Sequence, residues 1–386
     1  MNNVGSFYAI SKSRVNHQLN RWNSLLPGVK PYYAVKCNSE PYLLEWLSKG
    51  DVGFDCASVR EIESVKYVSP ESDIIFANPC KKKEDILYAS QSSVKTTVID
   101  SFEEVDKLQG WSGNSLIRIR VPDSGSKMPF GQKFGADPNE VPELIRYSEK
   151  KGLQICGISF HVGSGCENPY QFYDAIVLAA SLLPKIPKPI IDIGGGFTDE
   201  CFDKSAHQIM RSRGRIPSDT QLIAEPGRFF AASSHDLFVK VIGKKPGIVQ
   251  GHSGFRYTID ESLYGQFSCI PFDYARPMWI RIRPESTYER RKVPAILYGR
   301  TCDSLDMIAR SAMTEMLEEG DWLWFPHMGA YTTATSTEFN GFPKPYTLIL
   351  DENTPQLPNP AFMEHEWPYN IEYVSGVKVP QLRELI

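Results

Sequence analysis

Short apolar runs alternate with amphipathic segments over residues 31–230 of the chain. Pro41–Lys49 and Val141–Lys150 each place their apolar side chains on one face of a helix. Strands that alternate with helices pair in parallel through right-handed crossovers. The runs predicted as strands are 32–37, 52–57, 74–78, 96–100, 116–121, 154–162, 189–194 and 221–226. These units predict an α/β fold, a (β/α)8 barrel of the TIM type rather than an open sheet.

The pattern changes after Phe230, where strand-like pieces follow one another without long helical spacers and predict an antiparallel β-domain. Those pieces are 237–241, 254–259, 279–282, 294–297, 322–325 and 346–350. We therefore expect an N-terminal segment (1–30) that packs with the β-domain, a barrel (31–232) and a C-terminal β-domain (233–386). The proline-rich tail beyond Asp351 is expected to be extended or irregular.

Nearly every predicted barrel strand ends in a polar side chain or in glycine. A parallel barrel collects its chemistry at these carboxyl ends, and a purely structural barrel does not need polar groups there. In chain order the ends are Lys36, Asp55, Asn78, Asp100, Arg118 with Arg120, His161 with Ser164, Gly194 to Gly196, and Glu225 with Arg228. A lone lysine at a strand end usually extends into water. Because most of the other predicted strands also end in polar residues or glycine, Lys36 is expected to have a functional role.

Several of these ends fit one cofactor. Consecutive glycines let backbone N–H groups approach a phosphate, and Arg228 can add a fixed charge to it. Glu225 can keep a pyridine nitrogen protonated, which pyridoxal phosphate requires as an electron sink. Lys36 is then the amine that forms an imine with the cofactor aldehyde. Taken singly, a glycine turn, a solvated carboxylate and a core histidine are ordinary structural features.

Composition narrows the class of protein. The 386 residues are 41% hydrophobic and 23% charged with a net charge of −4, so neither nucleic acid nor an anionic membrane is expected as a partner. We expect neither a transmembrane span nor a signal peptide. The 8 cysteines form no C-x-x-C pair and no metal-ligand spacing, so we expect reduced thiols, a cytoplasmic location and no metal site.

The chain resembles the eukaryotic-type ornithine decarboxylases, which belong to the alanine-racemase-like barrel class of pyridoxal phosphate enzymes. The motifs that carry the resemblance span about residues 5–350. They are Tyr-Ala-Val-Lys-Cys-Asn (33–38), Gly-Phe-Asp-Cys-Ala-Ser (53–58), Phe-Ala-Asn-Pro-Cys-Lys (76–81), Lys-Phe-Gly-Ala (133–136), Ser-Phe-His-Val-Gly-Ser-Gly-Cys (159–166), Asp-Ile-Gly-Gly-Gly-Phe (192–197), Ala-Glu-Pro-Gly-Arg-Phe (224–229), Leu-Tyr-Gly-Gln-Phe (263–267), Thr-Cys-Asp (301–303), Met-Gly-Ala-Tyr-Thr (328–332) and Phe-Asn-Gly-Phe (339–342).

The resemblance implies pyridoxal-phosphate-dependent decarboxylation of L-ornithine to putrescine, a reaction of polyamine biosynthesis. It implies catalytic roles for Lys36, for Cys302, which returns a proton to the α-carbon, and for His161, which stacks on the ring. The implied cofactor-binding residues are Lys36, Asp55, Arg118, His161, Ser164, Gly194, Gly195, Gly196, Glu225, Gly227, Arg228 and Tyr331. Substrate binding is implied for Asp273, Asp303 and Tyr264. The implied assembly is a head-to-tail homodimer in which Cys302 and Asp303 serve the partner's barrel.

Alternatives remain within the same fold class. Acidic residues at the far end of the pocket favour a basic substrate over diaminopimelate, which carries a second carboxylate. Diaminopimelate decarboxylases have Cys-Glu-Ser where this chain has Cys-Asp-Ser (302–304). Arg276, by contrast, is a feature that favours diaminopimelate. Virus-type arginine decarboxylases are similar, with glutamate at position 273. Tyr274 resembles the plant lysine/ornithine decarboxylases, and one methylene gives only about 1–3 kcal/mol of discrimination.

Two further departures from the family pattern concern the shape of the pocket. Arg300 stands where a proline is usual, and His327 stands where an asparagine is usual. A binding protein of the antizyme-inhibitor type is the alternative from another class, but such proteins lose cofactor residues that this chain keeps. A racemase of the same barrel class is disfavoured as well.

Overall fold

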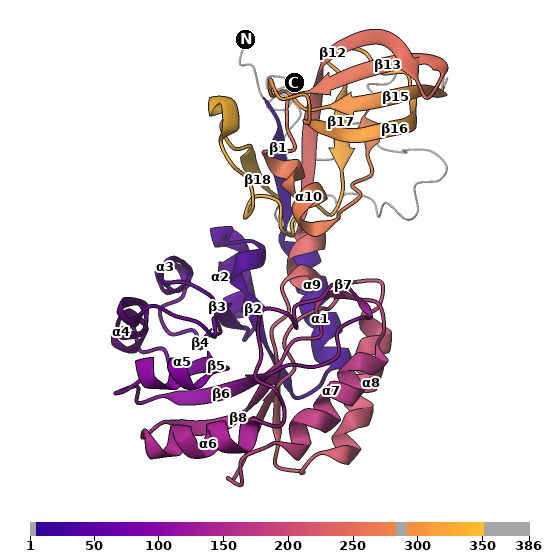
Figure 1. Ribbon diagram of the computed structural model, residues 1–386. Coiled ribbons are helices and arrows are strands. Elements are labelled where there is room, and N and C mark those ends of the chain that lie inside the picture. Colours follow the sequence, from indigo (N-terminus) through magenta and orange to yellow (C-terminus); the bar gives the residue numbers. More distant parts are fainter. Residues whose placement is uncertain (1–4, 283–291, 351–386) are drawn as a thin grey trace. The chain divides into compact units, whose positions relative to one another are not determined.

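The computed structural model describes residues 5–282 and 292–350. The chain forms two compact units (Figure 1). The barrel unit comprises residues 16–230, and the sheet unit combines residues 1–15 with residues 231–386. The domain boundaries at residues 30 and 232 stay predictions, and the barrel unit takes in residues 16–30 as well.

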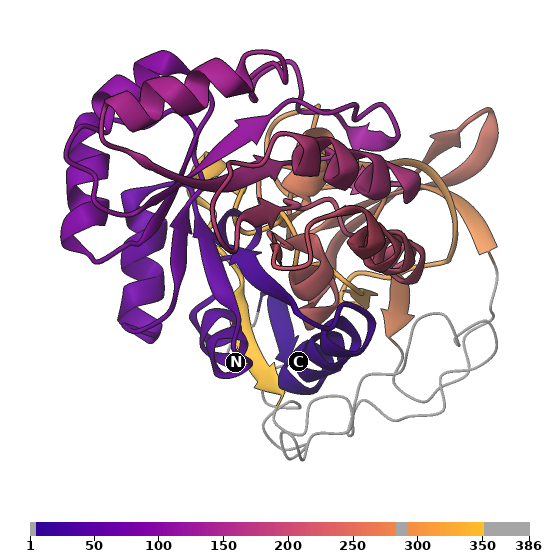
Figure 2. The ribbon, with the colours of Figure 1, turned by 90° about the horizontal axis from the view of Figure 1, so that it is seen from below.

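The barrel unit contains a closed barrel of parallel strands, as predicted (Figure 2). The strand order around the barrel is β10-β11-β2-β3-β4-β5-β6-β8. The strands are β2 (Val29–Ala34), β3 (Gly53–Cys56), β4 (Ile74–Phe76), β5 (Thr96–Ile99), β6 (Asn114–Ile119), β8 (Gln154–Phe160), β10 (Ile190–Asp192) and β11 (Gln221–Ala224). All eight lie where the apolar runs predicted strands, although β2 begins and ends three residues earlier than expected.

Helices surround this barrel, as Figure 2 shows. They are α1 (Lys12–Leu25), α2 (Pro41–Lys49), α3 (Val59–Val68), α4 (Lys83–Gln91), α5 (Phe102–Lys107), α6 (Val141–Lys150), α7 (Tyr170–Ser181), α8 (Phe202–Ser212) and α9 (Arg228–Ala231). Helix α2 starts at a proline, which suits the first helical turn because its missing N–H would have no partner there. Helix α3 begins at Ser58, whose side chain accepts the N–H of Glu61, while Glu61 accepts the N–H of Ala57.

Apolar side chains fill the inside of the barrel. Ile75, Val98, Leu116 and Ile223 come from four different strands and form one buried cluster. A filled interior leaves polar chemistry only at the ends of the strands. The fold therefore positions a site at the carboxyl ends, where the predicted residues lie.

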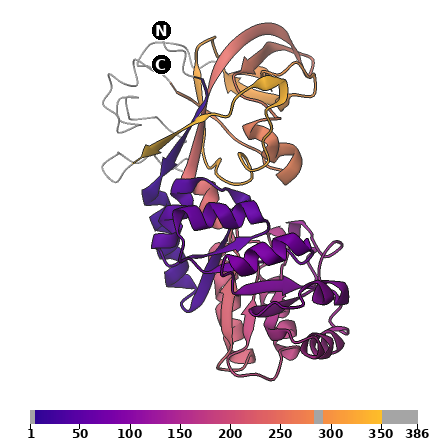
Figure 3. The ribbon, with the colours of Figure 1, turned by 90° about the vertical axis from the view of Figure 1, so that its left-hand side faces the viewer.

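The sheet unit contains an eight-stranded sheet that is mostly antiparallel (Figure 3). Two pairs depart from the expectation, because β1 pairs with β18 in parallel and β13 pairs with β15 in parallel. The strands are β1 (Phe7–Ser11), β12 (His235–Val249), β13 (His252–Ile259), β14 (Ile280–Ile282), β15 (Lys292–Tyr298), β16 (Met307–Glu315), β17 (Trp322–Phe325) and β18 (Tyr346–Leu350). A short helix, α10 (Cys269–Asp273), follows β13. The tail beyond Asp351 lies outside the described residues.

The sheet unit buries apolar side chains in two clusters. The larger includes Leu237, Tyr257 and Phe325, and the smaller includes Phe7, Phe238 and Trp324. Alternate residues of β12 and β17 thus face different clusters, as expected for strands covered on both faces. This packing fixes the loops between the strands, on which several predicted site residues lie.

Candidate active site

Lys36 lies just beyond β2, in the 3-10 turn η1 (Val35–Cys37). Its Nζ contacts Oδ2 of Asp55 on β3. The Asp55 side chain is fully buried, whereas the Lys36 side chain is 44% exposed. Oδ1 of Asp55 is buried and has no hydrogen-bond partner among the residues that the structure describes. The lysine amine is therefore oriented by a buried carboxylate and remains accessible to a small molecule.

The turn after β11 packs directly on the turn that carries this lysine. The N–H of Ala34 donates to the carbonyl of Pro226 at 3.2 Å. A Cβ atom at Gly227 would lie 3.0 Å from Cβ of Cys37 and 3.3 Å from Cβ of Ala34. Glycine at position 227 therefore allows the two turns to approach each other closely.

The three glycines after β10 occupy backbone space that no side chain could share. Gly194 has φ +62°, and a Cβ there would lie 2.2 Å from the carbonyl oxygen of Phe160. Gly196 has φ +102°, and a Cβ there would lie 2.6 Å from the carbonyl oxygen of Gly163. Both positions need glycine for conformation as well as for space. Backbone without side chains is the kind of surface that binds a phosphate.

Gly195 brings three of the predicted strand ends together. A Cβ at Gly195 would lie 2.9 Å from Nε2 of His161 and 2.8 Å from the carbonyl oxygen of Glu225. The N–H of Glu225 donates to the carbonyl of Gly194 at 2.7 Å. His161, the triple glycine and Glu225 therefore form one continuous surface at the carboxyl ends of β8, β10 and β11.

His161 is a neutral imidazole in this structure. Its Nδ1 accepts the N–H of Gly163 at 2.9 Å, and its ring lies 5.0 Å from the ring of Phe130. Burial lowers the pKa of His161 well below its ordinary value, and the charges of Arg118 and Lys36 lower that pKa further. Because Nδ1 is an acceptor, the ring proton lies on Nε2. A flat, uncharged ring of this kind suits stacking against another ring.

Arg228 and Ser164 form a polar pair beside the glycines. A guanidinium nitrogen of Arg228 donates to Oγ of Ser164 at 3.0 Å. Ser164 lies on β9 (Ser164–Cys166), which pairs with β7 (Ser126–Met128) in a small antiparallel sheet. The N–H of Cys166 donates to the carbonyl of Gly196 at 3.0 Å, which ties this sheet to the glycines. A cationic donor and a hydroxyl next to a backbone of glycines are suited to an anion.

Two acids adjoin the triple glycine, the fully buried Asp192 and the partly buried Glu225. Burial raises the pKa of Glu225 well above its ordinary value, and the carboxylates of Asp192 and Asp55 raise it further, while Lys36 and Arg118 oppose them. Burial also raises the pKa of Asp192 to about 7, opposed by hydrogen bonds from the N–H of Gly194 and from the Glu225 side chain. Neighbouring buried carboxyl groups cannot all be ionised. The Glu225–Asp192 pair therefore retains a proton near neutral pH.

The raised pKa of Asp192 predicts a pH-dependent stability. Between the ordinary value of 3.8 and about 7, the folded protein binds more protons at Asp192 than the unfolded chain does. Its contribution to the free energy of unfolding is therefore fully present below about pH 4 and is lost as the pH rises to about 7. We expect Asp192→Asn to flatten this part of the pH profile, measured by urea unfolding of cofactor-free protein at pH 5 and pH 8. Equal pH dependence in both proteins would contradict this assignment.

Asp192 and Glu61 are candidates that the sequence reasoning missed. Asp192 is fully buried, and its Oδ1 accepts the N–H of Gly194 at 2.9 Å. Glu61 has a pKa raised by burial, and the charges of Asp55 and Lys36 act on it. A signal for Asp192 was present, since it is an acid at the last position of a strand, two residues before the glycines.

Three other strand-end residues have local structural roles. Oδ1 of Asn78 accepts the N–H of Cys80 at 3.1 Å, and Oδ2 of Asp100 accepts the N–H of Gly135 at 2.9 Å. Arg120 forms an exposed ion pair at 3.2 Å with Asp137. These contacts organise loops on the barrel. By contrast, Arg118 influences the pKa values of both His161 and Glu225 and so belongs to the site electrostatically.

The remaining predicted residues lie in the sheet unit. The hydroxyl of Tyr264 contacts Oδ2 of Asp303. The hydrogen bond from the N–H of Leu305 and the contact with Tyr264 hold the pKa of Asp303 below its ordinary value. Cys302 is exposed, and its N–H donates to Oδ1 of Asn340 at 3.0 Å. A thiol and a carboxylate on consecutive residues are thus presented at one place in the sheet unit.

Two other predicted site residues are associated with left-handed backbone: Asp273 precedes such a residue, and Tyr331 is one itself. Asp273 is the last residue of α10, and the next residue, Tyr274, is left-handed with φ +52°. Tyr331 itself has φ +55°. Positive φ is costly for bulky residues and recurs at functional sites. The roles of Asp273 and Tyr331 in binding stay predictions.

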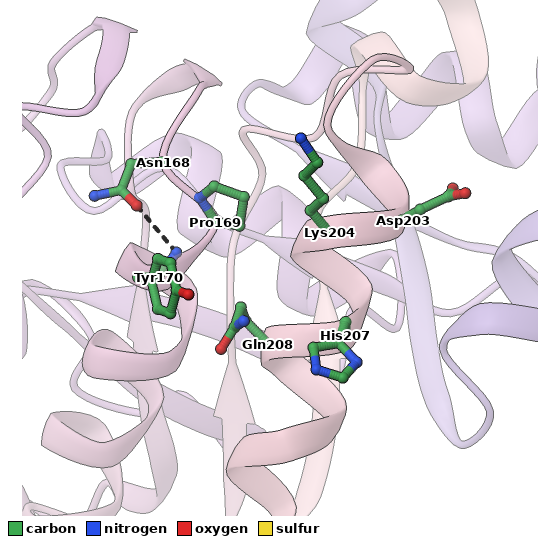
Figure 4. Close-up of a pocket in the computed structure, with 7 residues that line it drawn as sticks. All are labelled: Asn168, Pro169, Tyr170, Asp203, Lys204, His207 and Gln208. Atoms are coloured by element: carbon green, nitrogen blue, oxygen red, sulfur yellow. Dashed lines mark hydrogen bonds between the residues drawn. The ribbon is translucent and has the colours of Figure 1, made fainter.

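A separate hollow of about 510 Å³ lies on the outside of the barrel unit (Figure 4). It lies between α7 and α8 and is lined by Asn168, Pro169, Tyr170, Asp203, Lys204, His207 and Gln208. Oδ1 of Asn168 accepts the N–H of Tyr170 at 3.2 Å. This hydrogen bond satisfies a backbone N–H at the start of α7, which is a structural role. None of the predicted site residues lines this hollow.

The described residues contain neither a metal-ligating cluster nor a membrane-spanning helix. Over residues 5–282 and 292–350, no cluster of three or more His, Cys, Asp or Glu side chains is arranged to hold a metal ion. Within the same part of the chain, every helix is too short or too polar to cross a membrane.

The sequence matches a family model and a set of curated relatives. Residues 12–232 match the pyridoxal binding domain of pyridoxal-dependent decarboxylases. Ornithine decarboxylase of Caenorhabditis elegans is 36% identical over 373 residues, which cover 90% of this chain and 88% of the relative. Antizyme inhibitor 2 of Xenopus laevis is 37% identical over 347 residues, which cover 83% of this chain and 76% of the relative.

A solved structure is similar over almost the whole fold. Arginine decarboxylase of Paramecium bursaria Chlorella virus superposes with a TM-score of 0.84 at 34% sequence identity. The superposition covers 90% of this chain and 96% of the viral chain.

Proposed function

This chain belongs to the family of pyridoxal-dependent decarboxylases, and we propose that it converts L-ornithine to putrescine with loss of carbon dioxide. The observation that carries the proposal is the grouping of Lys36, Asp55, Glu225 and the triple glycine at one end of the barrel. Ornithine is proposed as substrate because several eukaryotic relatives that share about 36% identity bear the name ornithine decarboxylase.

The residues present fit pyridoxal phosphate. Lys36 would hold its aldehyde, the glycines with Ser164 and Arg228 would hold its phosphate, and Glu225 would face its ring nitrogen. The glycine cradle supports this fit, because a Cβ at Gly194, Gly195 or Gly196 would lie 2.2–2.8 Å from a neighbouring backbone oxygen and only backbone without side chains leaves its N–H groups open to a phosphate. The cofactor supplies an electron sink that accepts the electron pair released when carbon dioxide leaves.

The protein's own groups perform the proton transfers. Asp55 orients the Lys36 amine, the group that would hold the cofactor aldehyde. The Glu225–Asp192 pair holds the proton that the ring nitrogen needs. We propose that Cys302 gives a proton to the α-carbon after carbon dioxide leaves. Asp303, supported by Tyr264, would bind the distal ammonium.

A turnover comparison tests the choice of substrate. With ornithine, lysine, arginine and diaminopimelate, we expect ornithine to have the highest kcat/KM, measured as carbon dioxide released. Lysine is expected to follow within about 10–200-fold, because one methylene contributes only about 1–3 kcal/mol. Diaminopimelate should be inert, since its second carboxylate would meet Asp303. A higher kcat/KM for lysine or arginine would contradict the assignment of ornithine as substrate, but the protein would still be a decarboxylase.

We also propose a homodimer with shared sites, because Cys302 and Asp303 lie in a different unit from Lys36. Mixing inactive Lys36→Ala subunits with inactive Cys302→Ala subunits should then restore activity. Random pairing puts half of the subunits in mixed dimers, and each mixed dimer has one intact site, so about a quarter of wild-type activity is expected. Each variant mixed only with itself is the control. No recovery after subunit exchange, verified with tagged chains, would contradict shared sites.

The similarity to antizyme inhibitor 2 supports a second candidate, a non-catalytic binding protein. Such a protein would give no turnover with any of these substrates and would bind no cofactor. The complete set of barrel residues favours the enzyme. A place in polyamine biosynthesis and a cytoplasmic location follow as parts of the same proposal.

A further inference from the structure

Arg300 connects separate segments of the sheet unit around the Cys302 loop (residues 300–306). Its backbone N–H donates to the carbonyl of Glu261 at 3.1 Å, and its guanidinium donates to the carbonyl of Pro343 at 3.1 Å. The guanidinium carbon lies 4.4 Å from the ring centroid of Phe342. The side chain is only 15% exposed. These contacts hold the arginine in one conformation.

A buried carboxylate faces the guanidinium. Oε1 of Glu261 lies 3.9 Å from a guanidinium nitrogen of Arg300, and the Glu261 side chain is 1% exposed. The same oxygen accepts the N–H groups of Ser262 at 2.8 Å and Gln266 at 3.3 Å. The cation is therefore attached to the segment that also carries Tyr264. Arginine suits such a place because its planar fork can bond and stack at the same time.

The segment that Arg300 binds on its other side supports both functional residues of the loop. Within residues 338–343, Asn340 accepts the N–H of Cys302 at 3.0 Å. The ring of Phe339 stacks on the ring of Tyr264 at 4.4 Å, and the hydroxyl of Tyr264 contacts Asp303. Movement of this segment would therefore disturb the thiol and the carboxylate together.

Asp306 fixes the far end of the same loop. Its Oδ2 accepts the N–H of Thr301 at 2.9 Å and the hydroxyl of Thr301 at 2.7 Å. Its Oδ1 accepts the N–H of Leu263 at 2.7 Å. Asp306 thus holds the loop against residues 261–266, and Arg300 holds it against both this segment and residues 338–343.

We propose that Arg300 is a positioning residue that fixes Cys302 relative to Asp303 and so selects the length of the substrate. The inference rests on the proposed function, in which Cys302 acts at the α-carbon and Asp303 binds the distal ammonium. The separation of these two groups sets which carbon chain fits between them. Discrimination of one methylene is small, so a modest loosening of the loop is enough to erase it.

The test compares three variants as full-length holoenzyme, with rates expressed per bound cofactor. Arg300→Met keeps the length of the side chain but removes its charge and donors, and Arg300→Lys keeps the charge alone. Arg310→Met, at an exposed arginine on β16, is the matched control. For Arg300→Met we expect kcat/KM for ornithine to fall about 30-fold and the ornithine-to-lysine ratio of kcat/KM to fall at least about fivefold. Arg300→Lys should recover part of the kcat/KM for ornithine and part of the ornithine-to-lysine ratio. Arg310→Met should change neither quantity.

A purely structural arginine would give a different result, namely a lower melting temperature and less bound cofactor with an unchanged substrate ratio per site. That result overturns the proposal. Amide hydrogen exchange gives a readout independent of turnover, and we expect the Cys302 amide of Arg300→Met to exchange at least about tenfold faster. If no basic amino acid is turned over, the proposed function fails. Amide hydrogen exchange at Cys302 then still tests whether Arg300 fixes the Cys302 loop. If Arg300→Met does not fold, the same criteria apply to Arg300→Lys.

Discussion

Lys36→Ala is expected to abolish both amino-acid turnover and the visible absorbance of the bound cofactor. The amine at position 36 is the group placed to hold the aldehyde, and its contact with Asp55 orients it. We expect kcat to fall at least about 10³-fold, because a group that forms a covalent bond in the reaction has no substitute. Carbon dioxide release and absorption spectroscopy measure the two effects.

Lys30→Ala is the matched control for this experiment. Lys30 lies on the same strand, β2, and forms an ion pair with Asp73 at 2.6 Å rather than with Asp55. Its replacement should leave spectrum and turnover unchanged, since exposed ion pairs contribute little to stability. A Lys36→Ala protein that keeps its absorbance and its activity would refute the role of Lys36.

Glu225→Gln is expected to lower kcat by about 10²–10⁴-fold while the protein still binds the cofactor. Glutamine fills the same space but cannot carry the proton that the buried Glu225–Asp192 pair retains. A ring nitrogen that is not kept protonated is a poor electron sink, so the loss falls on the chemical step. Single-turnover decarboxylation at saturating cofactor isolates this step.

Asp199→Asn is a useful comparison for Glu225→Gln. Asp199 also follows the triple glycine, but its side chain is 54% exposed and pairs with Arg21. Its neutralisation should leave the single-turnover rate within about twofold, because it is a surface ion pair. Equal rates for wild type and Glu225→Gln would remove Glu225 from the proposed mechanism.

The fold was largely predictable because its periodic segments are strongly patterned. Helices α2 and α6 have the bounds that their apolar faces predicted, and all barrel strands lie where apolar runs were seen. The resemblance to the decarboxylases implies the same barrel fold, and the match to the family model agrees with that resemblance. Strand β16 was missed because Met307–Glu315 mixes polar and small residues without a clear alternation.

Part of the site depended on tertiary structure that sequence periodicity does not encode. Lys36 was expected at a strand end but lies in a 3-10 turn, because β2 ends at Ala34 where the backbone turns to meet Pro226. Asp192 was not singled out because its burial and its proximity to Glu225 arise only when β10 and β11 pair. The role of Arg300 likewise depends on contacts with residues that are distant in sequence.

The most direct test of the account is to find the lysine that holds the cofactor. Holoenzyme is reduced with borohydride, which makes the link between cofactor and amine permanent, then digested and mapped by mass spectrometry. The account predicts that the cofactor mass is found on the peptide that contains Lys36 and is lost in Lys36→Ala. Cofactor mass on any other lysine, or on none, would contradict it.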